Sequence, residues 1–221
     1  MTKCLLFDCD GTLVDSEHLC NVGLVVKFKE LGVVLDADEL VLRFRGWKLG
    51  RILDLLQREN SVVLPDNFVA AYREKVAELF EKELKPVQGI ESALKKLDYP
   101  KAVVSSGPRS KVEQALKVCR LTEYFRGNIY SAYEIGAWKP DPRIYEYAAQ
   151  DMGYAPSDCA AVEDGLVGVE ASVAAGIRTY FYNPAQLKCD LAGVVCFGAM
   201  CELPEVVAHN KQFKTDAFGA V

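Results

Sequence analysis

The sequence has little histidine and no compact cluster of cysteine and histidine. Its 221 residues include two histidines, and its eight cysteines are scattered without any C-x-x-C pair. Zinc sites and disulfide frameworks need such residues at characteristic spacings, and a Ser-His-Asp or Cys-His triad needs a histidine base. These classes of site are poorly supplied here, and the cysteine pattern favours a reducing, cytoplasmic location.

The chain also lacks a long apolar run and an excess of positive charge. No stretch approaches the length of a bilayer span, and Asp8 ends the run Cys4–Phe7 before it could serve as the apolar part of a signal peptide. The net charge of −5 offers no basic surface to nucleic acid or to an acidic membrane. We expect a monomer or weak homodimer with neither kind of partner.

Short, continuous apolar runs are present, and they are typical of strands covered on both faces. Helical stretches separate them from about residue 87 onward, so the pattern predicts an α/β fold with a doubly wound, Rossmann-like parallel sheet. The expected strands are Cys4–Phe7, Ala102–Val104, Asn128–Tyr130, Cys159–Val162 and Arg178–Tyr182, with Val194–Phe197 as a sixth. The expected helices of this core are Ile90–Leu97, Arg109–Cys119, Pro142–Met152 and Leu166–Ala175.

The segment between the first and second strands has a different character, because it is helical almost throughout. An inserted α-helical cap domain over residues 16–85 is therefore predicted, with residues 1–15 and 86–221 forming the core domain. Ligands of parallel α/β sheets bind at the carboxyl ends of the strands, where such a cap would be rooted. The expected cap helices are Glu17–Leu31, Ala37–Phe44, Leu49–Glu59 and Pro65–Leu84.

Polar and charged residues follow four of the predicted strands. Asp8 and Asp10 follow the first, Ser105 ends the second, Lys139 comes after the third, and Glu163 with Asp164 ends the fourth. Several carboxylates at one sheet edge require a cation, and oxygen ligands without histidine or thiolate suggest Mg²⁺. A site that combines Mg²⁺, a lysine and a hydroxyl suits a phosphoryl group.

The ordered set D-x-D-G-T, Ser, K-P-D-P and E-D resembles the haloacid dehalogenase-like superfamily, over nearly the whole chain. Within it, the chain is similar to phosphoglycolate phosphatases and β-phosphoglucomutases with a helical cap. The resemblance implies that Asp8 is a nucleophile forming an aspartyl-phosphate and that Asp10 is the general acid and base. It also implies that Ser105, the backbone around Ser106 and Lys139 hold the phosphoryl oxygens.

The same resemblance implies a Mg²⁺ site made by Asp8, the backbone carbonyl of Asp10, Asp164 and Glu163. The expected function is Mg²⁺-dependent hydrolysis of small phosphorylated metabolites, such as the sugar-acid phosphate 6-phosphogluconate. Gly165 stands where many relatives have serine after the E-D pair.

Two features of the predicted cap bear on the substrate. Leu49 stands where β-phosphoglucomutases carry an arginine, so a mutase is the alternative and hydrolysis is favoured. Arg45 and Lys48 lie in a basic run, which is usually a solvated surface but is here also a candidate for gripping the substrate. A non-catalytic or phospho-acceptor signalling protein is the remote alternative from another class.

Overall fold

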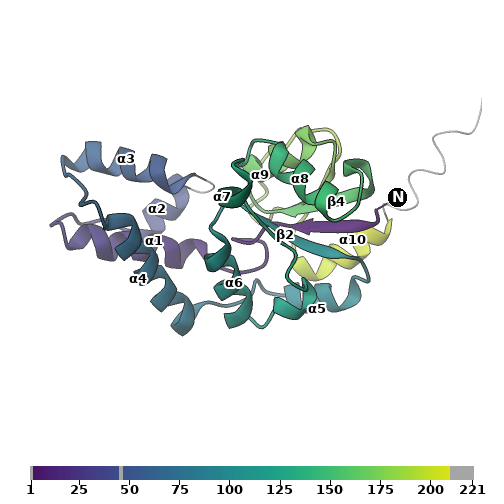
Figure 1. Ribbon diagram of the computed structural model, residues 1–221, viewed down its shortest axis with the longest axis horizontal. Coiled ribbons are helices and arrows are strands. Elements are labelled where there is room, and N and C mark those ends of the chain that lie inside the picture. Colours follow the sequence, from purple (N-terminus) through teal and green to yellow (C-terminus); the bar gives the residue numbers. More distant parts are fainter. Residues whose placement is uncertain (1, 45–46, 210–221) are drawn as a thin grey trace, which may run out of the picture.

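The structure, a computed structural model, describes residues 2–44 and 47–209. Its centre is a six-stranded sheet in the order β3-β2-β1-β4-β5-β6, with every neighbouring pair parallel (Figure 1). The order reverses at β1, which lies between β2 and β4. A ligand site is expected at the carboxyl ends of these central strands. The strands are β1 (Cys4–Phe7), β2 (Lys101–Ser105), β3 (Ile129–Ser131), β4 (Cys159–Glu163), β5 (Arg178–Tyr182) and β6 (Val194–Phe197).

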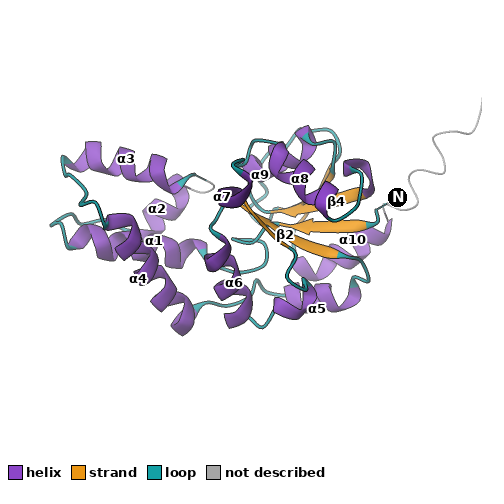
Figure 2. Ribbon diagram, viewed as in Figure 1, coloured by secondary structure: helices purple, strands orange, loops and turns teal. Residues whose placement is uncertain are grey.

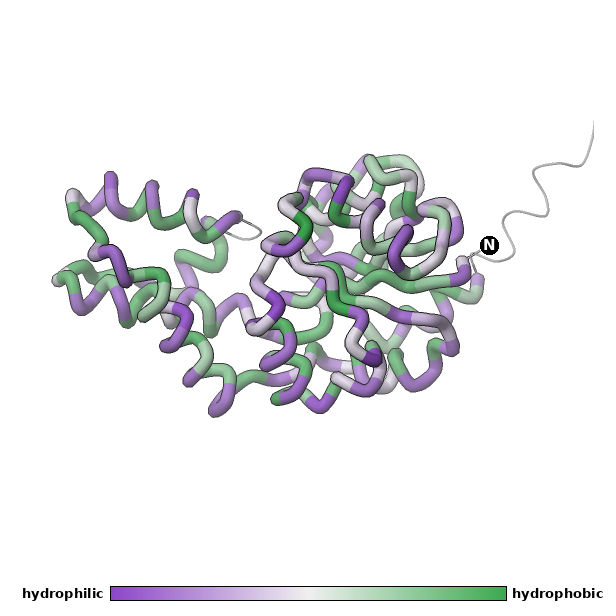
Figure 3. The backbone as a smooth tube through the Cα atoms, in the orientation of Figure 1, coloured by the Kyte–Doolittle hydropathy of each residue, from purple (hydrophilic) through white to green (hydrophobic). Residues whose placement is uncertain are grey.

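Helices cover both faces of this sheet, as Figure 2 shows, and Figure 3 shows apolar colouring along the strands between them. Leu5 and Phe7 of β1 pack in one cluster with residues of α5, α6 and α10, while Leu6 packs in a second cluster with residues of α8 and α9. Burial of each such side chain stabilises the fold by roughly 1.5–3 kcal/mol. The helices of this body are α5 (Ile90–Lys96), α6 (Arg109–Val118), α7 (Ala132–Ile135), α8 (Arg143–Asp151), α9 (Leu166–Ala174) and α10 (Leu203–His209), with the 3₁₀ turns η1 (Thr122–Tyr124), η2 (Pro156–Asp158) and η3 (Met200–Glu202).

Four further helices form a separate lobe beside the sheet (Figure 1). Their apolar faces turn toward one another, and the rings of Phe28 and Phe68 meet edge to face at 5.3 Å between centroids. Such a pair adds about 1 kcal/mol to the burial itself. We call this group the helical lobe: α1 (Glu17–Lys29), α2 (Ala37–Phe44), α3 (Leu49–Asn60) and α4 (Phe68–Glu83).

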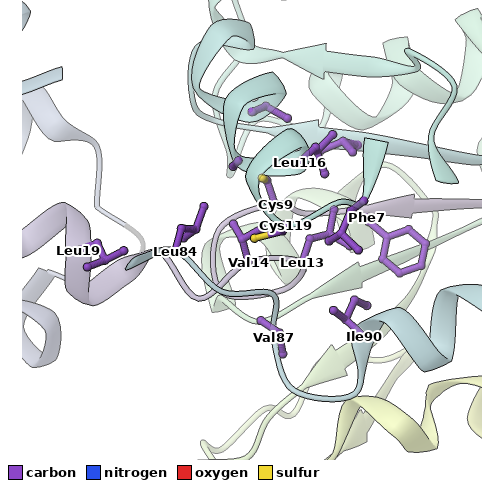
Figure 4. Packing of buried hydrophobic residues seen from close by; sticks show 14 of the residues in the cluster. Phe7, Cys9, Leu13, Val14, Leu19, Leu84, Val87, Ile90, Leu116 and Cys119 are labelled. Carbon is purple, nitrogen blue, oxygen red and sulfur yellow. The ribbon is translucent and has the colours of Figure 1, made fainter. Parts of the chain in front are cut away.

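Two chain segments join the helical lobe to the sheet, and they run side by side. Asp15 donates its backbone N–H to the carbonyl of Lys85 (2.9 Å), and Val87 donates to the carbonyl of Leu13 (3.0 Å). Leu13 and Val87 are also buried in the same apolar cluster, which Figure 4 shows at this junction. The lobe is therefore attached through a paired connection close to the end of β1.

The predicted α/β class and parallel sheet are confirmed, and all six strands occur within a residue or two of their predicted positions. The predicted helix Pro65–Leu84 begins later, at Phe68. The short helix α7 and helix α10, the last helix within the described residues, were not predicted. Within the described part of the chain, no helix is both long and apolar enough to cross a membrane.

Candidate active site

The acidic residues predicted at the strand ends meet at the switch point of the sheet. Asp8 follows β1 directly, and its backbone N–H donates to the carbonyl of Val162 in the adjacent β4 (2.9 Å). Glu163 ends β4 and Asp164 follows it. One carboxylate oxygen from each of Asp8, Glu163 and Asp164 lies within 4.8 Å of the others, and all three residues are buried. A buried set of oxygen ligands alone fits a hard divalent cation such as Mg²⁺.

Lys139 lies between two of these carboxylates. Its Nζ is 2.5 Å from Oδ1 of Asp8 and 2.6 Å from Oε1 of Glu163. The hydroxyl of Tyr145, from α8, also donates to Oε1 of Glu163. Glu163 therefore holds the ammonium of Lys139 next to Asp8. The third carboxylate, Asp164, accepts a hydrogen bond at Oδ1 from the hydroxyl of Thr12 (3.1 Å).

Burial dominates the electrostatics of this cluster. It raises the pKa of Asp8 to about 7, with Lys139 opposing and Asp164 and Asp10 adding to the rise. Burial likewise raises the pKa of Glu163 to about 7 against the opposing effect of Lys139. Burial lowers the pKa of Lys139, yet Asp8 and Glu163 outweigh it and hold that pKa above its ordinary value. Without a cation, Asp8 and Glu163 therefore bind protons more tightly than ordinary carboxylates do.

Asp10 has different partners from Asp8. Nζ of Lys111, in the first turn of α6, lies 2.7 Å from its Oδ1, and the hydroxyl of Ser16 donates to the same oxygen. Burial raises the pKa of Asp10, but Lys111 and the hydrogen bond from Ser16 outweigh this effect and leave the pKa below its ordinary value. The two aspartates of one motif are thus held in distinct electrostatic environments.

Ser105 and Ser106 lie where β2 ends. Ser105 is buried, and its Oγ accepts a hydrogen bond from the backbone N–H of Gly107 (3.0 Å). Accepting this bond uses a lone pair and leaves the hydroxyl proton for another acceptor. Both serines line the same cavity as Asp8 and Asp10.

Two glycines let the acidic side chains sit where they do. A Cβ on Gly11, whose φ is +83°, would lie 2.2 Å from Oδ2 of Asp164. A Cβ on Gly168, in the first turn of α9, would lie 2.1–2.2 Å from the carboxylate atoms of Glu163. The backbone of α9 therefore packs directly against Glu163.

This contact makes a testable prediction about Gly168. Replacing Gly168 with alanine pushes the Glu163 carboxylate away from Lys139, and we expect a loss of about 10–100-fold in kcat/KM, the range for residues that orient metal-site groups. Gly165→Ala is the matched control, because a Cβ at Gly165 meets nothing within 4 Å. Steady-state assays of both variants check this, and equal activities would contradict it.

The site opens into a cavity of about 950 Å³ between the sheet edge and the helical lobe. The lobe contributes aromatic and basic residues to its wall, among them Trp47, Lys48 and Arg51. The ammonium of Lys48 lies 5.1 Å from the ring centroid of Trp138, which comes from the sheet side. Lys48 therefore lines the cavity. Arg45, the other residue predicted to hold the substrate, lies outside the described residues.

The structure brings together Asp8, Asp10, Ser105, Ser106, Lys139, Glu163 and Asp164, as the strand-end pattern predicted. Sequence reasoning assigned nothing to Lys111, Ser16 and Tyr145. In the sequence, Lys111 has the pattern of a lysine on a helix surface, and Tyr145 belongs to the apolar face of a predicted helix. Neither position therefore indicates a role in the site. The position of Ser16 before a helix reads as an N-cap.

The chain is similar to known proteins over most of its length. The family model described as haloacid dehalogenase-like hydrolase matches residues 5–182. The chain is 34% identical over 207 residues to 6-phosphogluconate phosphatase of Escherichia coli (strain K12), covering 92% of this chain and 94% of that protein. It is 25% identical to hexitol phosphatase B of the same organism over 93% of this chain and 94% of the relative.

Among solved structures, a haloacid dehalogenase-like protein of unknown function from Agrobacterium tumefaciens str. C58 superposes with a TM-score of 0.81 at 27% identity. That match covers 96% of this chain and all of the other. The chain therefore shares its fold with a solved haloacid dehalogenase-like protein and is similar in sequence to two phosphatases.

Proposed function

We propose that this chain, which belongs to the haloacid dehalogenase-like hydrolase family, hydrolyses phosphate monoesters of small metabolites. Sugar phosphates and sugar-acid phosphates are the proposed substrates, with 6-phosphogluconate the first to test because the 34%-identical relative is named for it. The observation that carries the proposal is Asp8, a buried carboxylate bonded to Lys139 and grouped with Glu163 and Asp164.

Asp8 is the proposed nucleophile. In the first step one of its carboxylate oxygens forms a bond to phosphorus as the bond from phosphorus to the ester oxygen breaks, which leaves an aspartyl-phosphate. Lys139 is bonded to Asp8 and is thereby placed beside the incoming phosphoryl oxygens, whose negative charge it offsets. In the second step a water oxygen bonds to phosphorus as the bond from phosphorus to the Asp8 oxygen breaks, which releases inorganic phosphate and regenerates the Asp8 carboxylate.

Asp10 is the proposed proton-transfer group for both steps. It donates a proton to the ester oxygen of the leaving alcohol and then takes one from the attacking water. Two residues along the chain from Asp8, it lines the same cavity and does not share the Lys139 contact. Ser105 and the backbone at Ser106 are proposed to donate hydrogen bonds to the phosphoryl oxygens.

A divalent cation, proposed to be Mg²⁺, completes this site. Asp8, Asp164 and the backbone carbonyl of Asp10 are its proposed ligands, with Glu163 either a ligand or the group that holds Lys139. When bound, the cation offsets the charge of the carboxylates and of the phosphoryl group. The buried acidic cluster and its raised pKa values support this part of the proposal.

The helical lobe is proposed to act as a cap, with residues 16–85 inserted into a core of 1–15 and 86–221. Its position over the cavity would exclude bulk water during phosphoryl transfer and select the leaving group. Leu49 favours hydrolysis over the mutase alternative, because it supplies no charge to hold a second phosphate. We further propose that the protein is cytoplasmic and acts as a monomer or weak homodimer.

A screen of phosphorylated metabolites for phosphate release tests this function. We expect Mg²⁺-dependent release from sugar and sugar-acid phosphates, and the absence of release from the whole panel would overturn the proposal.

Lys48→Ala is expected to raise KM about 5–10-fold for sugar-acid phosphates and less for neutral sugar phosphates, since one solvent-exposed charge contact contributes about 1 kcal/mol. Lys29→Ala, an exposed lysine at the end of α1, is the matched control.

A further inference from the structure

Helix α4 has two distinct faces. Its buried residues recur every four positions on an apolar face: Phe68, Tyr72, Val76 and Phe80. Arg73, Ala77 and Glu81 repeat the same spacing one residue further along, about 100° around the helix, and each forms a hydrogen bond with a residue outside the helical lobe. The contacts of this second face are polar, so breaking them costs little net free energy because water replaces each partner.

The first of these contacts lies near the connection between the helical lobe and the sheet. Helix α4 runs beside α6 (Figure 1), and Gln114 of α6 donates from its amide nitrogen to the carbonyl of Ala77 (3.1 Å) and to Oε1 of Glu81 (2.9 Å). At 1.5 Å per residue, Glu81 is about 5 Å along the helix axis from Leu84, the residue that follows α4. Gln114 therefore holds α4 close to the point about which the lobe would turn.

The second contact lies much further from that connection. Arg73 donates from Nη2 to the hydroxyl of Tyr133 in α7 (3.1 Å), and its Cζ is 5.4 Å from the centroid of that ring. Arg73 is about 17 Å along the same axis from Leu84, so a rotation at the connection moves it about three times as far as Glu81. We propose that the contact between Arg73 and Tyr133, which we call the Arg73 latch, forms when the lobe closes over the cavity and breaks when it opens, while the Gln114 contacts persist. The inference rests on the proposed function, in which the lobe acts as a cap.

The backbone of Tyr133 is fixed on the sheet side of the cavity. Its N–H donates to Oγ of Ser131 (3.2 Å), and the Ser131 hydroxyl donates to the carbonyl of Gly107 (2.7 Å) in the loop that follows β2. The next residue, Glu134, accepts a hydrogen bond from Nε of Arg109 (2.7 Å) in α6. Tyr133 therefore keeps its place beside the loop after β2 whether the lobe is closed or open.

The ring of Tyr133 also packs against Trp138, the residue before Lys139. The ring centroids lie 5.5 Å apart at an interplanar angle of 75°, and both residues line the cavity. Tyr133 remains 49% exposed, which leaves its hydroxyl and a ring face for the guanidinium of Arg73. A planar guanidinium suits this double contact, because it donates hydrogen bonds and also stacks on aromatic faces. The Arg73 latch therefore fastens the lobe on the side of the cavity that carries Lys139.

Replacing Arg73 with methionine tests the latch, because it removes the guanidinium and keeps an unbranched apolar side chain. We expect kcat/KM to fall about 3–10-fold, by the same factor for a neutral sugar phosphate and for a sugar-acid phosphate, since a smaller closed fraction weakens the apparent affinity for every substrate. Lys82→Met, which removes an exposed lysine from the last turn of α4, is the matched control and is expected to have no effect. A loss confined to the sugar-acid phosphate would show instead that Arg73 binds the substrate, and would overturn the latch.

Two further variants test the partner and the position of the latch. Tyr133→Phe keeps the ring on Trp138 and removes the hydroxyl, so we expect a loss of about 2–5-fold in the unmodified protein and no further loss in Arg73→Met. Equal losses in both backgrounds would show that Arg73 and Tyr133 act separately. Gln114→Ala is expected to change kcat/KM less than about twofold, because its contacts are kept in both arrangements; a loss as large as that of Arg73→Met would contradict the proposed movement.

Small-angle X-ray scattering measures the opening of the lobe independently of activity. We expect the radius of gyration of substrate-free Arg73→Met to exceed that of the unmodified protein, and that of Lys82→Met to equal it. Equal radii for all three proteins would overturn the latch. Absence of phosphate release by the unmodified protein would refute the proposed function, while the scattering comparison would still decide whether Arg73 holds the lobe closed.

Discussion

Replacing Asp8 with asparagine is expected to lower kcat for phosphate release by at least roughly 10³-fold, because a carboxamide oxygen does not attack phosphorus. The side chain keeps its shape, so the cavity and the sheet edge remain in place. The buried ammonium of Lys139 loses one of its two carboxylates and keeps Glu163. The variant is therefore expected to fold while losing its chemistry.

Phosphate release from p-nitrophenyl phosphate and from a sugar phosphate measures this loss, with a thermal melt to establish folding. Asp15→Asn is a suitable control because Asp15 follows the same motif and is exposed. A folded Asp8→Asn protein that retained more than about a tenth of the activity would show that another group attacks phosphorus.

Removal of the divalent cation is expected to abolish activity and to lower the melting temperature. Asp8, Glu163 and Asp164 then repel one another in a buried site. A ligand at 100 times its Kd stabilises the native state by about 2.7 kcal/mol, which corresponds to roughly 5–10 °C for a chain of this size. Chelation followed by titration with Mg²⁺, monitored by activity and by melting temperature, measures both effects.

The stabilisation by Mg²⁺ is expected to depend on pH. Burial raises the pKa of Asp8 and that of Glu163 to about 7, so the metal-free native state binds protons more tightly than the unfolded chain. That contribution to stability is present at low pH and is lost as the pH rises through about 7. Protons compete with the metal at pH 5, and the Mg²⁺-induced rise in melting temperature is therefore larger at pH 8.

Asp164→Asn provides the matched test of the metal ligands. It is expected to raise the Mg²⁺ concentration needed for half of the effect by about tenfold or more. Asp66→Asn, at an exposed position between α3 and α4, is expected to leave that concentration unchanged. Equal Mg²⁺ dependence in both variants, or an equal shift in melting temperature at pH 5 and pH 8, would contradict the assignment.

The acidic part of the site could be predicted from the sequence because it depends on strands. Asp8 and Glu163 sit at the ends of continuous apolar runs, and neighbouring parallel strands necessarily bring such ends to one edge. The pairing of β1 with β4 then places both residues within reach of Lys139. The positions of these motifs at the ends of predicted strands were therefore enough to predict that the acidic residues lie close together.

The groups contributed by helices could not be predicted in this way. Whether Lys111 and Tyr145 turn toward the site depends on the rotation and placement of α6 and α8, which hydrophobic periodicity fixes only to within a helix face. Ser16 was missed for a different reason. Its position at the start of a helix suggests a capping role, but its hydroxyl makes no capping bond and donates to Asp10 instead.

Trapping the covalent intermediate tests the central claim most directly. Acid quenching of the protein during turnover of a phosphate-labelled substrate, followed by peptide mapping, reports where the phosphoryl group resides. We expect one labelled peptide, containing Asp8, whose label is absent in Asp8→Asn. Rapid turnover with no protein-bound label at any quench time, or label on a different residue, would contradict the account.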